Sequence, residues 1–264
     1  MNDFLQKVVE IREFVRAETG MFAAGIALSG YFLYNELSMI AIFVFLTAFF
    51  SSCAIYSYNH RTDKEEDRIN NNGINPLSIE GKGILITILC LAASFGFSLF
   101  LSFASFIIYL ISISSGMLYS TFRLKKYYFI KNFYAGVVFS LPFLMGETAY
   151  GFSYEMLNYL PVPFLSGFAI NLLGDIRGFN GDLYAGLKTL PVIAGMEWAK
   201  NILHGILYLI VFLSLVCYPF FVYLAPFMVT LSIFLIKNDM KITRACMIFS
   251  FATLPAFILV MKWI

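Results

Sequence analysis

Charged residues are scarce in this chain of 264 residues. They make up 13% of it, against about a quarter in an ordinary soluble domain, whereas hydrophobic residues make up 60%. The apolar segments run for about twenty residues, which is the length of a helical membrane span. They show no alternation of apolar and polar positions, which argues against the strands of a membrane barrel. The composition therefore indicates a helical protein with several membrane spans.

Histidine and cysteine are also rare. The chain has 2 His and 4 Cys, and none of them forms a Cys-x-x-Cys motif or a Cys/His set. A metal site built from these side chains is therefore not expected. The cysteines lie in or beside apolar segments, where we expect small buried or lipid-facing residues: Cys53, Cys90, Cys217 and Cys246. No basic aromatic array suggests a nucleic-acid partner.

Nine apolar segments are long enough to be spans. If the N-terminus lies inside, every Lys and Arg except Lys262 falls on the inner side, as the positive-inside rule requires. We therefore predict an all-α protein of the cell membrane, with a cytoplasmic N-terminus and its polar chemistry on the cytoplasmic side, where the connections are longer. The predicted spans are 19–36, 38–57, 83–101, 103–120, 129–147, 156–173, 200–217, 219–236 and 244–262.

The segment before the first span is amphipathic. Its polar side carries charged residues, and its apolar side is predicted to face lipid, as in an interfacial helix: Leu5, Val8, Val9, Ile11 and Val15. We predict one domain over 1–264, in which 1–18 is this interfacial helix. The rest divides into a first half over 19–147 and a second half over 148–264.

Two polar stretches interrupt the apolar sequence, one in each half. The first contains Asn59, Asp63 and Asp67, and the second contains Asn171, Asp175 and Asp182. Positions four apart lie on one face of a helix, and Asp175 and Asp182, which are seven apart, lie nearly on one face, so each stretch is expected to present its amides and carboxylates together. Ionisable residues at the edge of a membrane are costly to hold there and usually mark a functional site.

Clustered carboxylates repel one another unless a cation is present, and Mg²⁺ commonly bridges carboxylates to substrate phosphates. Basic residues near the same membrane edge can hold further phosphate oxygens. The candidates are Arg68, Arg123, Lys125, Lys126, Lys131 and Lys188. The pattern favours a diphosphate site at the inner surface, although solvated loops between spans can also be rich in charge.

The motifs resemble those of the UbiA superfamily of intramembrane prenyltransferases, over nearly the whole chain. The first motif runs from Asn59 through Asp63 to Asp67 and is followed by Arg68-Ile69-Asn70. The second motif runs from Asp175 to Gly181-Asp182 and is followed by Lys188-Thr189-Leu190-Pro191. The resemblance implies a bundle of nine transmembrane helices around a central cavity.

The resemblance also implies a chemistry. Mg²⁺ held by Asp63, Asp67, Asp175 and Asp182 binds the diphosphate of a prenyl donor, and a lipophilic or aromatic acceptor attacks the prenyl group. Asn59 belongs to the same catalytic set. Binding of the diphosphate is expected from Arg68, Arg123, Lys125, Lys126, Lys188 and Asn171. Aromatic faces can shelter the allylic cation, and Tyr56, Tyr58 and Tyr119 are candidates near the inner ends of their spans.

The second motif departs from the family pattern. Gly178 stands where the family has its middle Asp, Gly174 replaces a Lys, and His60 replaces an Asp in the first motif. These departures argue against a standard enzyme of ubiquinone, menaquinone or archaeal ether-lipid synthesis. Two alternatives to a prenyltransferase stay open. One is a UbiA-like terpene cyclase, and the other is a non-catalytic lipid-binding or carrier protein of the membrane.

Overall fold

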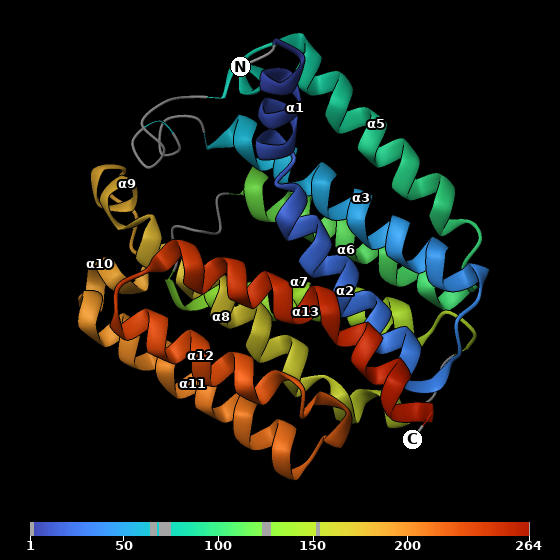
Figure 1. The fold of residues 1–264 in the computed structure, drawn as a ribbon. Coiled ribbons are helices and arrows are strands. Elements are labelled where there is room, and N and C mark those ends of the chain that lie inside the picture. The colour runs from blue at the N-terminus through green and yellow to red at the C-terminus, as the bar shows by residue number, and fades with distance from the viewer. Residues whose placement is uncertain (1–2, 64–67, 69–74, 123–127, 152–153, 264) are drawn as a thin grey trace.

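A computed structural model describes residues 3–63, 68, 75–122, 128–151 and 154–263. These residues form α-helices and short 3-10 helices joined by turns (Figure 1). The elements are α1 Asp3–Phe14, α2 Ala17–Tyr34, α3 Met39–Thr62, η1 Pro76–Ser78, α5 Gly81–Ser98, α6 Phe103–Thr121, α7 Tyr128–Glu147, η3 Tyr154–Tyr159, α8 Pro161–Arg177, α9 Phe179–Tyr184, α10 Leu190–Ala194, α11 Met196–Val216, η4 Pro219–Phe221, α12 Leu224–Ile236 and α13 Met240–Trp263.

Each of the nine predicted spans coincides in large part with one of the longer helices. Among the described residues, 6 helices are long and apolar enough to cross a membrane, and Leu224–Ile236 is a shorter apolar helix. The chain is therefore a multi-pass helical membrane protein, while nine spans and a cytoplasmic N-terminus stay predictions. The span expected over 156–173 corresponds to the candidate span Leu157–Arg177, in which η3 occupies the chain as far as Tyr159 and α8 starts at Pro161.

Helix α2 lies at the centre of the bundle and packs against α3, α7 and α13. Glycines allow these close approaches: a Cβ atom on Gly146 would lie 1.8 Å from the Ala27 carbonyl oxygen, and one on Gly25 would lie 2.1 Å from the Phe251 carbonyl oxygen. Small residues commonly serve this purpose between membrane helices. Protein, and not lipid, therefore surrounds most of α2.

Helix α1 forms over most of the segment predicted to be amphipathic. The side chains of Leu5, Val8, Val9 and Ile11 are exposed, and their contact with lipid stays a prediction. The prediction for Val15 was wrong, because α1 ends at Phe14 and the chain then turns inward. Phe14 and Val15 are buried in a small cluster with Cys53 and Leu77, which anchors the end of α1 to the bundle.

Candidate functional site

The C-terminal end of α3 carries the first two polar residues of the first motif. The helix ends at Thr62, and the backbone N–H of Asp63 donates to the Asn59 carbonyl oxygen at 2.9 Å. The Ser120 hydroxyl of α6 donates to Asn59 Oδ1 at 2.9 Å, which fixes the orientation of the amide. Asn59 and Asp63, which the spacing puts on one face, both line the same large cavity.

The C-terminal end of α8 carries the start of the second motif. Lys131 of α7 forms an ion pair with Asp175 Oδ1, and their side chains are 9% and 3% exposed. One turn earlier, Asn171 Nδ2 donates to Asn132 Oδ1 at 2.5 Å. The other carboxylate oxygen, Asp175 Oδ2, is buried and accepts no hydrogen bond from the described residues. Such a buried oxygen is costly unless a ligand or cation satisfies it.

A helix break separates the two acids of the second motif. The expectation of one shared face assumed a continuous helix, but α8 ends at Arg177 and α9 begins after Gly178. The backbone bonds nearly continue across the break, since the Gly178 N–H donates to the Gly174 carbonyl oxygen at 2.8 Å and the Asp182 N–H donates to the Gly178 carbonyl oxygen at 3.0 Å. Asp182 therefore still lines the cavity with Asp175.

The cavity has a volume of about 900 Å³, which is within the range of small-molecule sites and near its upper end. Its walls combine polar and apolar groups from α2, α3, α6, α7, α8 and α13. Tyr119 and Tyr134 stack with their ring centroids 5.8 Å apart, and Tyr134 donates to the Ser115 carbonyl oxygen at 2.8 Å. The apolar part of the lining includes Ala23, Ile55, Val138, Phe139, Pro142 and Ile170.

The oxygen atoms that line this cavity suit a hard cation such as Mg²⁺ as ligands. They belong to carboxylates and amides, and Asp175 Oδ2 accepts no hydrogen bond from the described residues. Within that part of the chain, no three His, Cys, Asp or Glu residues lie close enough to hold a metal ion by themselves. Since Mg²⁺ in proteins often takes only one or two carboxylates and completes its shell with phosphate oxygens and water, the donor set fits an ion shared with an anionic ligand.

The predicted diphosphate-binding residues do not all gather here. Asn171 lines the cavity, whereas the side chains of Arg68 and Lys188 are exposed and are not among the described residues that line it. Asp67, Arg123, Lys125 and Lys126 lie outside the described residues. Of the three tyrosines, Tyr56 and Tyr119 line the cavity, and the Tyr58 hydroxyl instead lies 3.1 Å from the Thr121 hydroxyl.

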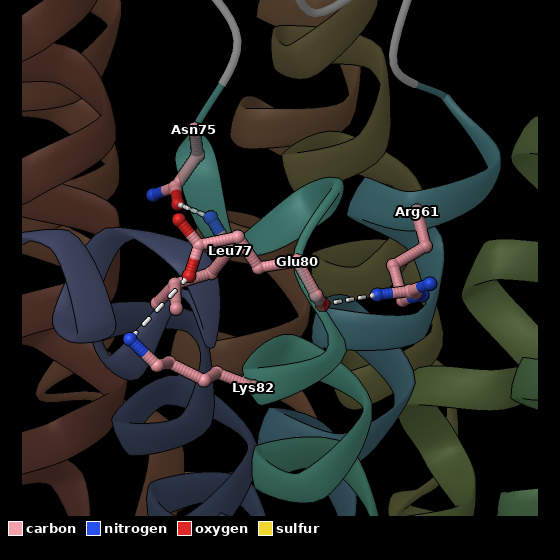
Figure 2. A network of polar contacts seen from close by, with 5 residues as sticks. All are labelled: Arg61, Asn75, Leu77, Glu80 and Lys82. Carbon is pink, nitrogen blue, oxygen red and sulfur yellow. Dashed lines mark hydrogen bonds and ion pairs between the residues drawn. The ribbon is translucent and has the colours of Figure 1, made fainter.

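The chain that follows the first motif is tied back to the end of α3 (Figure 2). Arg61 Nη1 donates to the Glu80 carbonyl oxygen at 3.1 Å, and the Glu80 carboxylate lies 3.9 Å from Lys82 Nζ. The Asn75 side chain accepts from the Leu77 N–H at 3.0 Å and donates to the Glu10 carbonyl oxygen at 3.0 Å. These contacts hold the start of α5 against α1 and α3, and they thereby position the C-terminal end of α3.

Sequence reasoning missed cationic residues of this cavity that come from the two ends of the chain. Arg16 and Arg244 also line the cavity, although 228 positions separate them in the sequence. No local spacing could have joined them, because their proximity depends on the packing of α2 against α13.

Comparisons with known proteins agree with this architecture. Residues 19–238 match the UbiA prenyltransferase family. Among curated proteins none matches this chain.

Solved structures with similar folds include a digeranylgeranylglyceryl phosphate synthase, at 22% identity and TM-score 0.63 over 95% of this chain and 99% of that one. A UbiA homologue from Archaeoglobus fulgidus bound to GPP and Mg²⁺ has 18% identity and TM-score 0.70 over 94% and 99% of the two chains. A UbiA homologue from Aeropyrum pernix K1 has 16% identity and TM-score 0.76 over 93% and 98%. Identities this low show a shared fold alone. The family match covers most of the sequence, and by it the chain belongs to the UbiA prenyltransferase family.

Proposed function

We propose that this protein is a Mg²⁺-dependent intramembrane prenyltransferase, which moves a prenyl group from its diphosphate to a lipophilic or aromatic acceptor. One observation carries the proposal: polar residues from both motifs, Asn59 and Asp63 with Asn171, Asp175 and Asp182, line a single cavity in a chain of this family. The Archaeoglobus fulgidus homologue of the same fold binds GPP and Mg²⁺, which supports the choice of donor.

Asp63, Asp175 and Asp182 are the described residues that would hold Mg²⁺ ions together with the diphosphate, one or two carboxylates to an ion, and Asp67 is proposed as a further ligand. When bound, the ion would neutralise charge on the diphosphate and on the leaving group. Lys131 would serve the same end from the protein side, because its ammonium group lies buried against Asp175. Arg68, Arg123, Lys125, Lys126 and Lys188 stay candidates for the outer diphosphate oxygens.

In the transfer, the bond between the prenyl C1 and the diphosphate oxygen breaks, and the diphosphate leaves with the electron pair. The acceptor's nucleophilic atom forms the new bond to C1 and releases a proton. Tyr56, Tyr119 and Tyr134 line the cavity, where ring faces would shelter an allylic cation. The apolar lining around Ile55 and Phe139 would hold the prenyl chain and exclude water from the cation.

The test uses purified protein in detergent with Mg²⁺ and radiolabelled geranyl, farnesyl or geranylgeranyl diphosphate, with and without a membrane extract. Label transferred to an extract component supports the proposal. A cyclised hydrocarbon formed without extract would identify a terpene cyclase instead. No release of diphosphate under any condition would contradict both enzymes and leave a non-catalytic lipid-binding protein or carrier.

The placement of the protein is part of the proposal. We assign it to the cell membrane as one domain over 1–264, with the N-terminus and the cavity mouth facing the cytoplasm. This orientation is measured by labelling an introduced cysteine with a membrane-impermeant maleimide on intact cells. In a Cys217→Ser background, because native Cys217 is itself exposed, a cysteine introduced at exposed Lys82 of the predicted inner side should react only after lysis, whereas labelling on intact cells would contradict the orientation.

A further inference from the structure

His60 replaces an acid of the family pattern, and the proposed prenyl transfer assigns it no role. It lies on α3 between Asn59 and Asp63, yet its side chain is buried and is not among the described residues that line the cavity. Consecutive positions on a helix point about 100° apart, so the residue that follows Asn59 faces a different neighbour. That neighbour is the junction of α1 and α2, and both of these helices pack against α3 (Figure 1).

Two contacts fix the His60 ring at this junction. Its Nε2 accepts a hydrogen bond from Nε of Arg16 at 3.1 Å. The ring also stacks on that of Phe14, with the centroids 6.0 Å apart and the planes inclined by 23°, and Phe14 is fully buried at the end of α1. The nitrogen lone pair that accepts from Arg16 is not directed at a metal ion. The His60 side chain is thus engaged by α1 and α2, away from the carboxylates of the cavity.

Two residues of α3 hold the Arg16 side chain together. Tyr56 and His60 are four positions apart, so they lie on one face of the helix. The guanidinium carbon of Arg16 lies 5.4 Å from the centroid of the Tyr56 ring, while its Nε bonds to His60. The C-terminal end of α3 therefore carries two neighbouring rows of side chains. Asn59 and Asp63 line the cavity, and Tyr56 and His60 hold Arg16.

The backbone conformation of Arg16 depends on such support. Its φ of 48° and ψ of 55° are left-handed, which is uncommon for residues other than Gly, Asn and Asp. Its carbonyl oxygen accepts the backbone N–H groups of Thr19 at 2.8 Å and of Gly20 at 3.1 Å, so this residue begins α2. Such conformations persist where surrounding contacts maintain them, often at functional sites. Since Arg16 lines the cavity, the contacts that hold it also shape the cavity wall.

We propose that His60 is a positioning residue for the transfer, which holds Arg16 in place at the cavity wall and binds no metal. This inference rests on the proposed function, because it assigns His60 an effect on the transfer that acts through Arg16. The buried contact with Phe14 ties the end of α1 to the helix that carries the first motif. The replacement of an acid at position 60 therefore removes no ligand from the metal site.

The experiment is a double-mutant cycle on the transfer of label from the prenyl diphosphate that wild type uses, with Mg²⁺ and membrane extract. His60→Leu keeps an apolar side chain against Phe14 and removes the hydrogen-bond acceptor, whereas His60→Gln keeps an acceptor oxygen. Arg16→Asn removes the guanidinium, and Asn tolerates the left-handed conformation. Arg12→Gln is the matched control, because Arg12 pairs with Glu18 at 2.6 Å across the same junction and both side chains are exposed.

His60→Leu should lower kcat/KM by about tenfold, since a hydrogen bond to a charged group is lost. His60→Gln should stay within about threefold of wild type. Arg12→Gln should stay within about twofold, because an exposed ion pair contributes little. In the Arg16→Asn background, His60→Leu should change kcat/KM by less than about twofold, because its effect acts through the missing guanidinium. Thermal unfolding shows which variants are folded, and His60→Met replaces His60→Leu if that variant is not.

Further measurements do not depend on turnover. His60→Asp restores the acid of the family pattern, and its affinity for Mn²⁺ should equal that of wild type within about twofold, because position 60 faces the junction and not the metal site. Hydrogen exchange of the Thr19 and Gly20 amides should be faster in His60→Leu than in wild type, since both amides bond to the Arg16 carbonyl oxygen. It should be unchanged in His60→Gln and Arg12→Gln.

An equal loss from His60→Leu in the wild-type and Arg16→Asn backgrounds would show that His60 does not act through Arg16. Wild-type kcat/KM in His60→Leu would exclude a positioning role, and tighter Mn²⁺ binding by His60→Asp would place position 60 at the metal. Wild-type protein that transfers no label under any condition would contradict the proposed function itself. In that case, or if Arg16→Asn has no turnover, exchange of the Thr19 and Gly20 amides still decides whether His60 holds Arg16.

Discussion

The cavity has two charged sides that are built in opposite ways. The carboxylate side consists of Asn59, Asp63, Asn171, Asp175 and Asp182, and the arginine side consists of Arg16, Lys237, Lys241 and Arg244. On the carboxylate side, residues four apart on one helix lie together, and the buried acid Asp175 is compensated by Lys131 of the neighbouring helix. On the arginine side, the charges come from the two ends of the chain, and Arg244 has only a hydroxyl as its partner among the described residues. One side thus carries acids that a neighbouring helix compensates, and the other carries cations whose charge a hydroxyl leaves uncompensated.

The largest effect should come from removing a carboxylate at the end of α3. Asp63→Ala should lower kcat/KM by about 10³-fold, because a metal ligand that stabilises the leaving diphosphate contributes several kcal/mol. Asp67→Ala, Asp175→Ala and Asp182→Ala are expected to act in the same direction. Steady-state assays with labelled geranyl diphosphate measure the change, and thermal unfolding should show that Asp63→Ala is folded, since Asp63 packs into no apolar core.

Glu197→Ala is the matched control for this prediction, because Glu197 is an exposed acid of the same protein that does not line the cavity. Its kcat/KM should equal that of wild type. If Asp63→Ala turned over substrate at the wild-type rate, the carboxylate side would not be part of the catalytic site. The contrast between the two sides would then have no functional meaning.

The next effect concerns the buried ion pair. Lys131→Met leaves Asp175 as an uncompensated buried acid, so we expect a loss of about 3–5 kcal/mol in the free energy of unfolding. The double variant Lys131→Met with Asp175→Leu should recover most of that loss, because it buries two apolar groups in place of a pair. Denaturant titration in detergent measures both. Activity should be lost in both, since each lacks a cation for the diphosphate.

This pair of variants separates stability from function. A double variant as unstable as Lys131→Met would mean that the ion pair does not account for the destabilisation. Recovered activity in the double variant would contradict the role assigned to Lys131. Arg244→Gln offers the comparison on the other side, where no carboxylate partner is left behind and a smaller loss of stability is expected.

The sequence predicts the carboxylate side better than the arginine side for a physical reason. Asn59 and Asp63 are one helical turn apart, so their spacing alone puts them on one face. The long apolar segments likewise locate the helices, and the amphipathic pattern locates the exposed surface of α1. Proximity of Arg16 to Arg244 depends instead on α2 packing against α13, which follows from side-chain fit and close glycine contacts such as Gly25 with Phe251.

Two smaller features also depend on tertiary contacts that the sequence pattern does not predict. The burial of Val15 depends on where α1 ends, and periodicity alone does not predict the turn into α2 at Arg16. The break at Gly178 interrupts the helix that the spacing of Asp175 and Asp182 assumes, although both acids still reach the cavity. In each case the residue pattern indicates the right surface, and tertiary contacts decide the local path of the chain.

A gain of metal affinity is the next expected effect. Gly178 lines the cavity at the position where the family pattern has an acid, and its φ of −86° and ψ of 9° suit any residue. Gly178→Asp should therefore tighten binding of Mn²⁺, as a spectroscopic substitute for Mg²⁺, by about tenfold, which is about 1.4 kcal/mol. Gly178→Asn, which has the same shape without the charge, should not. Equal Mn²⁺ affinity in both variants would show that this position does not reach the metal.

The smallest effect should come from the aromatic lining that lies between the two sides. Tyr56 contacts Arg16 on one side, and Tyr119 stacks on Tyr134 on the other. Since a ring face stabilises a cation by about 0.5–2 kcal/mol, Tyr119→Leu should lower kcat by roughly 3- to 30-fold. Tyr119→Phe keeps the ring and should stay within about twofold of wild type, because no hydrogen bond of the Tyr119 hydroxyl to the described residues holds the ring in place. An equal loss in both variants would assign the effect to the hydroxyl group, and the Tyr119 ring would then not stabilise the cation. A loss confined to Tyr119→Leu would place the reacting carbon between the carboxylate side and the arginine side.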